Sequence, residues 1–139
     1  MAFNGYLIRF PKTDTTITGE SIIKVESFKA KRNVQDLNPY RDANGIMHRN
    51  ALSHVPIKVE FETRDGITNT ELQNFMNILR NNYTVVKERK LRIEVYIPEQ
   101  DTYVEQNVYM PDLDPTIKYI DLENNVVKYN SVRFAFIGY

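Results

Sequence analysis

The chain has 139 residues, no cysteine and a formal net charge of zero. This length fits a single domain, 1–139, that can bury a continuous core, and the lack of cysteine excludes disulfides, zinc–thiolate sites and cysteine nucleophiles. The balanced charge disfavours a general nucleic-acid binder. The sequence shows neither a long apolar run nor a signal-peptide pattern, so we also expect no membrane insertion.

The N-terminal residues predict two strands joined by a loop. Tyr6, Ile8 and Phe10 alternate on one face of a strand at 5–10. Residues 11–20 hold several threonines, a glycine and a proline, which predict a loop. Residues 22–31 predict a second strand with imperfect alternation, which indicates either a bulge or a strand that is apolar on both faces.

Residues 35–54 predict a long loop. The segment combines Asn38-Pro39 with a turn signal at 42–45 and shows no clear periodicity. At about 20 residues it is longer than most connections in compact domains, and loops of that length are usually functional or disordered. It is also too apolar for a flexible tether, because it carries Tyr40, Ile46, Met47 and Leu52.

The middle of the chain predicts one strand and the only helix. Residues 55–62 are apolar at odd positions up to Phe61, with charged residues between them from position 58, as expected for a half-buried strand. Thr68 and Glu71 have the spacing of a capping box, which predicts a helix at about 68–82. Its apolar stripe consists of Leu72, Phe75, Met76 and Leu79.

The C-terminal part predicts four more strands, at 91–97, 102–110, 117–122 and 126–137, with a tight hairpin turn at Asn124-Asn125. Together these patterns predict a mainly β (α+β) fold. We expect a β-sandwich or partly closed barrel of about seven strands with one flanking helix.

Charge is unevenly distributed along the chain. Between Glu99 and Glu123 there are seven acidic residues against one basic residue, Lys118, which gives −6 for this segment and +6 for the rest. A molecule polarised in this way can stack on its own copies with acidic surface against basic surface. The alternative is that acidic turns only keep the protein soluble.

No residue pattern predicts a catalytic or metal site. His48 and His54 stand six residues apart without further ligands at a metal-binding spacing. Asp112 and Asp114 are bracketed by prolines and lack the glycine of a calcium loop. Phosphate loops, nucleophile elbows and metalloprotease motifs are also missing. We therefore expect no cofactor and no enzymatic activity.

Tyrosines are frequent in the C-terminal third, and two interpretations are open. Rings of this kind are favoured at protein interfaces, where the hydroxyl finds a partner, but they also suit half-buried sheet edges. The surrounding acidic charge argues against a single-stranded nucleic-acid platform. The residues concerned are Tyr103, Tyr109, Tyr119, Tyr129 and Tyr139.

The run Val55–Phe61 before the helix, the segment Val108–Asp112 and the ending Tyr129–Ile137 resemble a family of small structural tail proteins from phages and prophages of Gram-positive hosts. The resemblance implies a tail-tube, distal-tail or baseplate component with a tail-tube-like fold. Such folds are sandwiches or barrels with a flanking helix and a long loop or hairpin used in ring contacts. It implies no catalytic residue.

The sequence thus leads us to expect a structural component of a phage or phage-like tail. Its partners would be itself and other tail proteins, and it would assemble in the host cytoplasm and reside in the virion tail. The alternative is a carbohydrate- or receptor-binding β-module at a tail tip that uses the tyrosines. The interface candidates are Tyr40, Arg41, Ile46, Met47, Leu52, Asp112 and Asp114.

Overall fold

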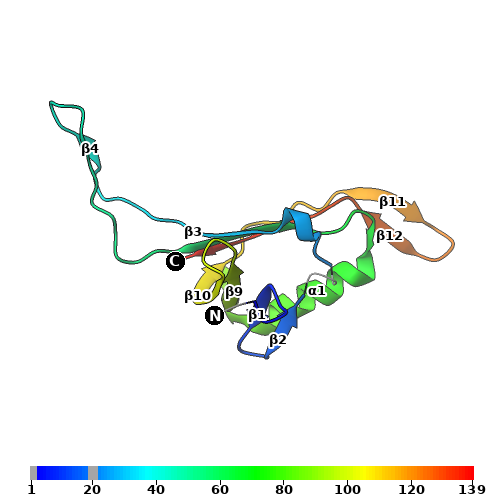
Figure 1. Ribbon diagram of the computed structural model, residues 1–139. Helices are drawn as coiled ribbons and strands as arrows, with labels where there is room; N and C mark the ends of the chain where they lie inside the picture. Colours follow the sequence, from blue (N-terminus) through cyan, green and yellow to red (C-terminus); the bar gives the residue numbers. More distant parts are fainter. Residues whose placement is uncertain (1–2, 19–21) are drawn as a thin grey trace.

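The computed structural model describes residues 3–18 and 22–139 (Figure 1). One α-helix, α1 (Asn69–Asn82), and two 3₁₀ turns, η1 (Val25–Ser27) and η2 (Val86–Glu88), accompany the strands in this part of the chain. The strands are β1 (Ile8–Phe10), β2 (Thr15–Ile17), β3 (Lys29–Arg32), β4 (Tyr40–Arg41), β5 (Met47–His48), β6 (Ile57–Glu62), β7 (Ile67–Thr68), β8 (Tyr83–Val85), β9 (Lys90–Ile97), β10 (Thr102–Tyr109), β11 (Ile117–Asp121), β12 (Val126–Tyr129) and β13 (Arg133–Gly138).

Most strands belong to one antiparallel sheet with the order β2-β1-β9-β10-β13-β6-β3, and β8 pairs with β9 beside this path. The β9–β10 hairpin is its longest ladder, running from Thr102 opposite Ile97 to Tyr109 opposite Lys90. No ladder among the described residues joins the edge strands β2 and β3, so the sheet does not close into a barrel. Two smaller sheets, β11-β12-β7 and β4-β5, complete the fold.

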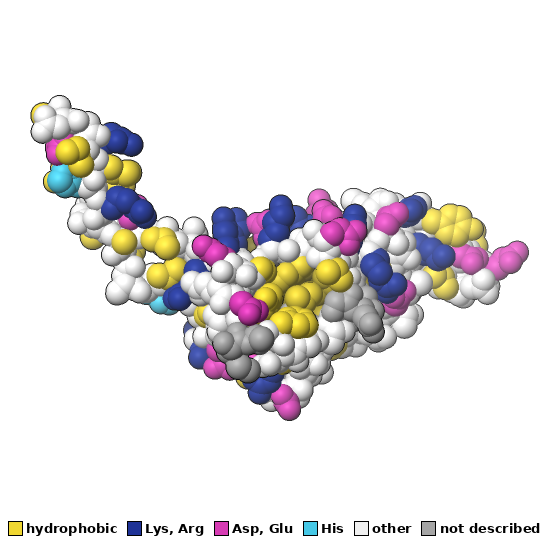
Figure 2. Space-filling model, viewed as in Figure 1, with side chains coloured by type: hydrophobic (Ala, Val, Ile, Leu, Met, Phe, Trp, Pro, Cys, Tyr) yellow, Lys and Arg dark blue, Asp and Glu magenta, His cyan; other side chains and the backbone are white. Residues whose placement is uncertain are grey.

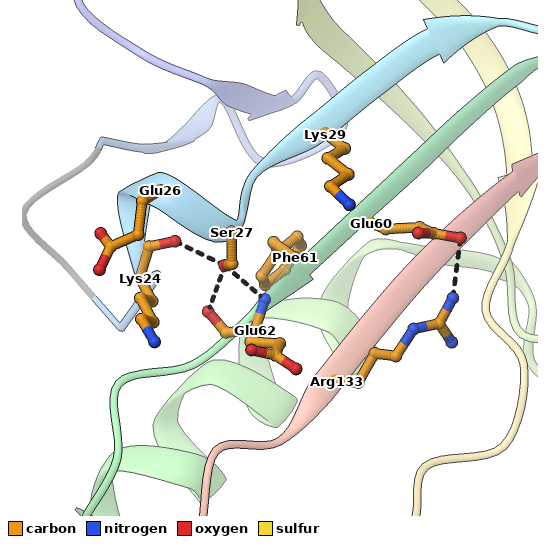
Figure 3. Close-up of a pocket in the computed structure, with 8 residues that line it drawn as sticks. All are labelled: Lys24, Glu26, Ser27, Lys29, Glu60, Phe61, Glu62 and Arg133. Atoms are coloured by element: carbon orange, nitrogen blue, oxygen red, sulfur yellow. Dashed lines mark hydrogen bonds and ion pairs between the residues drawn. The ribbon is translucent and has the colours of Figure 1, made fainter.

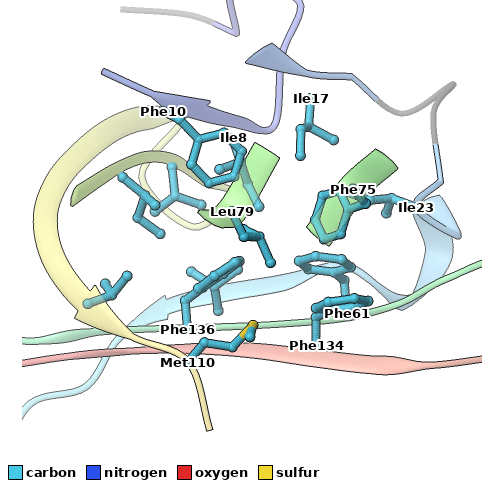
Figure 4. Packing of buried hydrophobic residues seen from close by; sticks show 14 of the residues in the cluster. Ile8, Phe10, Ile17, Ile23, Phe61, Phe75, Leu79, Met110, Phe134 and Phe136 are labelled. Atoms are coloured by element: carbon cyan, nitrogen blue, oxygen red, sulfur yellow. The ribbon is translucent and has the colours of Figure 1, made fainter. Parts of the chain in front are cut away.

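The core lies between α1 and the curved main sheet (Figure 4). Phe75 and Leu79 of α1 point between the β1–β2 hairpin on one side and strands β6 and β13 on the other (Figure 4). The predicted helix stripe is confirmed, because Leu72, Phe75 and Leu79 are buried and Met76 packs against the core at its margin. The capping box is also present, with Thr68 and Glu71 satisfying each other's backbone amides.

The prediction of a mainly β fold with one α-helix is confirmed, but about seven strands was too few. The described residues hold thirteen strands, and six of them have only two or three residues. Strands this short show no period in the sequence. The segment 11–20, predicted as a loop, contains β2, while its residues 19–20 lie outside the described part of the chain.

Two predicted strands are interrupted. In 22–31, Ile23 bridges Thr63 before η1 turns the chain into β3, and this turn explains the imperfect alternation. In 126–137, Asn130 donates its amide to the Thr116 carbonyl, and Val132 donates to Thr63 Oγ1. The break assigns β12 to the small sheet and β13 to the main sheet.

Two hairpins project from the body at opposite ends of the molecule (Figure 1). The segment 33–54, which we call the arm, leaves β3, carries β4 and β5 and returns to β6. At the other end, β11 and β12 form a shorter hairpin beyond the N-terminus of α1 (Figure 1). Both elements therefore extend beyond the body, where another molecule could reach them.

Candidate assembly surfaces

The arm, expected from sequence as a loop, is a two-stranded ribbon with its own hydrogen bonds. Backbone bonds join Leu37 to Asn50 and Leu52 to Gln35, both N–H to carbonyl, at 2.9 and 2.8 Å. Closer to the tip, β4 pairs with β5, and the ring of Tyr40 stacks on the His48 ring at 4.8 Å. All of these contacts are made between residues of the arm itself.

The arm ends in a turn organised by one carboxylate. Asp42 Oδ1 accepts hydrogen bonds from the backbone amides of Asn44 and Ile46, at 2.9 and 3.1 Å. Its Oδ2 lies 2.9 Å from His48 Nε2. These bonds lower the pKa of Asp42, the His48 contact most strongly, so the carboxylate stays ionised and the turn stays closed. Gly45 completes the turn at φ 79°, a left-handed angle that favours glycine.

The arm buries nothing against the rest of the chain. None of its residues is buried, and its large apolar side chains are about half exposed. Hydrophobic side chains are visible along its length in Figure 2. Because monomeric proteins rarely expose apolar side chains gathered on one projecting element, this ribbon is a candidate contact surface. The exposed set is Val34, Leu37, Tyr40, Ile46, Met47 and Leu52.

The base of the arm is fixed by a side-chain amide from β10. Gln106 Oε1 accepts the Ile57 amide at 3.0 Å, and Gln106 Nε2 donates to the Val55 carbonyl at 2.9 Å. Gly138 lies directly against this site, where an added Cβ would stand 2.8 Å from the Ile57 nitrogen and 2.9 Å from Gln106 Oε1. His54 contacts the Tyr139 carbonyl beside it. The arm therefore leaves the body at a defined place.

The β11–β12 hairpin is a second exposed apolar element, and it was not among the sequence-predicted contacts. Its exposed side chains lie on both faces of β11, a pattern visible in the sequence because apolar residues stand at 117, 119, 120 and 122. A strand buried on one side would show apolar residues at alternate positions only. The exposed residues are Ile117, Tyr119, Ile120 and Leu122, with Leu122 83% exposed.

The acidic candidates lie away from the arm. Asp112 and Asp114 belong to the connection between β10 and β11, and both are exposed. Asp112 Oδ1 pairs with Arg89 Nη1 at 2.7 Å, although the Asp112 side chain is 91% exposed. The structure thus separates the seven predicted interface residues into five on the arm and two on the body. Part of the negative charge of the segment from Glu99 to Glu123 is thus already paired with a basic side chain of the same chain.

The hollow drawn in Figure 3 is lined mainly by charged side chains, and its one serine is held by backbone hydrogen bonds. Ser27 Oγ donates to the Lys24 carbonyl at 2.6 Å and accepts the Glu62 amide at 2.8 Å. No histidine is among the residues that line this hollow of ≈ 370 Å³, and the Ser27 hydroxyl is already bonded to backbone groups. Glu60 in the same hollow has its pKa lowered, mainly by a hydrogen bond from Lys58.

Neither a metal cluster nor a membrane span is found in the described part of the chain. No three carboxylate or imidazole side chains converge there as metal ligands would. α1 is neither long nor apolar enough to cross a bilayer. His48 and His54, considered above as ligands, instead contact Asp42 and the Tyr139 carbonyl.

Five tyrosines form two small clusters, and the hydroxyls of the first cluster already have partners within the chain. Tyr6 and Tyr103 pack at 4.7 Å between ring centroids, and Tyr103 also contacts Tyr96 at 5.5 Å. Tyr6 donates to Glu94, Tyr96 to Asp101 and Tyr103 to the Tyr6 carbonyl. At the C-terminus, Tyr109 and Tyr139 pack edge to face. The hydroxyls of the first cluster are thus engaged within the chain rather than presented to a ligand.

Two solved structures share this fold over the whole chain. One is a chain from the tail of an empty gene transfer agent (GTA) particle, determined with helical refinement and C6 symmetry. It superposes with a TM-score of 0.55 at 10% identity, covering 100% of this chain and 94% of that one. The other comes from the virion of a native GTA particle, with a TM-score of 0.53, 11% identity and the same coverage. At this identity the likeness shows the fold.

Comparison of the sequence, rather than of the fold, gives a family assignment. No curated protein matches it, whereas the model of a family of unknown function matches residues 1–139. That match spans every element described above, from β1 to β13, and includes both the arm and the β11–β12 hairpin. The chain therefore belongs to the family of unknown function DUF6711.

Proposed function

We propose that this chain is a structural subunit of a phage-like tail, that it acts by assembly with its own copies and with other tail proteins, and that it has no enzymatic activity. More specifically, we propose a tube-type subunit that forms closed rings, assembles in the host cytoplasm and resides in the virion. The likeness to a chain in a GTA tail of C6 symmetry supports this proposal, because a heterologous contact repeated around an axis closes into a ring.

The arm is the observation that carries the proposal. It is a preformed ribbon with six half-exposed apolar side chains, and it covers no part of its own body. In a ring, this element would lie on a neighbouring copy and bury its apolar side chains there. The proposed contact residues on the arm are Tyr40, Arg41, Ile46, Met47 and Leu52, and Asp112 and Asp114 on the body are proposed as charged contacts with a neighbouring copy.

The test is whether a polar arm abolishes assembly while the subunit stays folded. In the double variant Ile46→Asp/Met47→Asp, both changed side chains are about half exposed (59% and 46%). We expect wild-type protein to form rings or tubes at high concentration in electron micrographs, and the variant to remain monomeric with an unchanged unfolding midpoint. Val25→Asp, at a 52% exposed site on the body, is the matched control and should assemble normally.

Two results would contradict the proposal. One is a wild-type chain that neither self-associates nor binds other tail proteins. The other is an arm variant that assembles as well as wild type.

A further inference from the structure

A groove lies at the C-terminal end of α1, between the helix, η2 and the end of β10. It measures ≈ 720 Å³ and is lined on its apolar side by Met76, Val86, Met110 and Leu113. Val86 is 72% exposed, which is high for a side chain that borders an apolar groove. The groove is thus an open surface on the body that is apolar on one side and charged on the other.

The charged side chains that line this groove are two arginines, Arg80 and Arg89, and one carboxylate, Asp112, so its net charge is positive. Arg89 is paired with Asp112 at 2.7 Å. Arg80 Nη1 contacts only neutral acceptors, Asn77 Oδ1 at 2.9 Å and Gln73 Oε1 at 3.2 Å. Arg80 takes part in none of the ion pairs found among the described residues, so its charge is available to an acidic partner.

The tip of the β11–β12 hairpin has the complementary chemistry. Leu122 is the most exposed of the large apolar side chains, at 83%, and the acidic Glu123 follows it. Asp121 holds the turn by accepting the amides of Glu123 and Asn124, at 3.1 and 3.3 Å. Its carboxylate is used within the turn, whereas Leu122 and Glu123 are presented outward on a preorganised loop.

The groove and the tip lie at opposite ends of α1 and cannot meet within one copy. The hairpin is attached at the first residue of the helix, where Asn69 Oδ1 accepts the Val127 amide at 3.2 Å, and it extends away from the helix (Figure 1). Arg80 stands in the last turn of the same 14-residue helix, which is about 20 Å long.

We propose that the hairpin tip of one copy docks in the α1–η2 groove of a second copy, with Leu122 on the apolar side and Glu123 against Arg80. The inference rests on the proposed self-assembly and names a contact for it. The two surfaces differ, so the contact is heterologous and each copy can both give a tip and receive one. It adds a charge-matched contact to the apolar contact made by the arm.

The cysteine-free sequence allows a direct test by cross-linking. In the double variant Leu122→Cys/Val86→Cys, oxidation of the assembled protein should give a ladder of dimers, trimers and higher oligomers on non-reducing gels. Each single variant should give none, and a mixture of the two should give dimers only, because each chain then carries one thiol. Leu122→Cys/Val25→Cys places the second thiol outside the groove and should not cross-link.

A charge exchange tests the same contact without thiols. Arg80→Glu and Glu123→Arg should each slow assembly by roughly tenfold at low salt, since exposed charges act mainly on association rate. The double variant Arg80→Glu/Glu123→Arg restores the opposite pair and should recover most of the rate. If the double variant instead assembles more slowly than either single variant, by the sum of their two effects, the proposed pairing is overturned.

The outcomes separate this inference from the proposed function. Rings or tubes that form without the Leu122–Val86 cross-link overturn the tip-in-groove contact but leave the tail function in place. Dimers from Leu122→Cys alone also overturn it, because they would show that two tips meet each other. A wild-type chain that stays monomeric in every condition overturns the contact together with the proposed self-assembly.

Discussion

At the residue scale, the core depends on a group of phenylalanine rings around α1. The Phe75 ring packs edge to face on Phe134 at 4.8 Å and on Phe61 at 6.1 Å, and the Phe75 side chain is only 4% exposed. Phe61 in turn stacks on Phe134 at 5.4 Å. One ring from the helix therefore joins strands β6 and β13 to the remainder of the core.

Removing that ring tests whether α1 is a core element rather than a partner-binding one. We expect Phe75→Ala to lower the free energy of unfolding by about 3–5 kcal/mol, because it loses the transfer energy of the ring and leaves a cavity. Urea unfolding would measure this loss, and the dependence of the free energy of unfolding on urea concentration (the m-value) should stay unchanged. The control is Tyr40→Ala on the arm, which should change the free energy of unfolding little. A loss below about 1 kcal/mol for Phe75→Ala would show that the core does not depend on this ring.

The hydrogen bond from Tyr6 to Glu94 makes part of the fold sensitive to high pH. This bond is the main cause that raises the pKa of Tyr6 from 10.0 to about 12. A raised pKa means that the contribution to stability is complete below pH 10 and is lost as the pH rises through about 12. We expect tyrosinate absorbance to show a late-titrating group that Tyr6→Phe removes and Glu94→Gln shifts toward 10. Unchanged titration in Glu94→Gln would contradict this assignment.

At the element scale, the base of the arm depends on Gln106. Its side-chain amide accepts the Ile57 amide and donates to the Val55 carbonyl. Gln106→Leu should cost about 1–3 kcal/mol, because the Ile57 amide loses its acceptor in a partly buried site. Unfolding and amide exchange at Ile57 would measure this effect. Gln106→Glu keeps the acceptor and should retain most of the protection of the Ile57 amide; equal losses in both variants would point to packing instead.

The arm itself should be far more mobile in the isolated subunit than in an assembly. Two-stranded ribbons are marginally stable alone in water, and the Leu37 and Leu52 amides have only such a ribbon to protect them. We expect these amides to exchange quickly in the monomer and slowly in rings or tubes, as measured by hydrogen exchange. Core amides in β9 provide the internal control. Equal protection of the arm in both states would mean that assembly does not involve it.

At the scale of the whole molecule, charge separation should govern how fast copies meet. The segment from Glu99 to Glu123 carries −6, and Asp112 and Asp114 stand exposed within it. We expect Asp112→Lys/Asp114→Lys to slow assembly at low salt, as measured by light scattering. The difference should vanish at about 0.5 M salt, where the Debye length is below about 5 Å. Glu26→Lys, outside the segment, is the control, and an unaffected rate in the double variant would leave the acidic residues a role in solubility only.

The sequence by itself determined the elements whose signals are local. The capping box at Thr68 and Glu71 and the stripe around Phe75 predicted α1 almost to the residue, because an α-helix satisfies its backbone within one segment. The alternating runs in β6 and β9 were equally readable, since each strand buries one face against a common core. The exposed apolar residues of the arm were also visible as an apolar segment without periodicity.

Only the tertiary structure decided the features that depend on distant partners. The ribbon form of the arm comes from pairings such as Leu52 with Gln35, and its place on the body comes from Gln106 in β10 and Gly138 in β13. The split between β12 and β13 depends on Thr63, far away in the chain. No local pattern encodes these contacts, because each one is made between residues that are distant in sequence and whose side-chain types fit many environments. For the same physical reason, the α1–η2 groove became visible only once the chain was folded, because Met76, Val86 and Met110 come from separate parts of the chain.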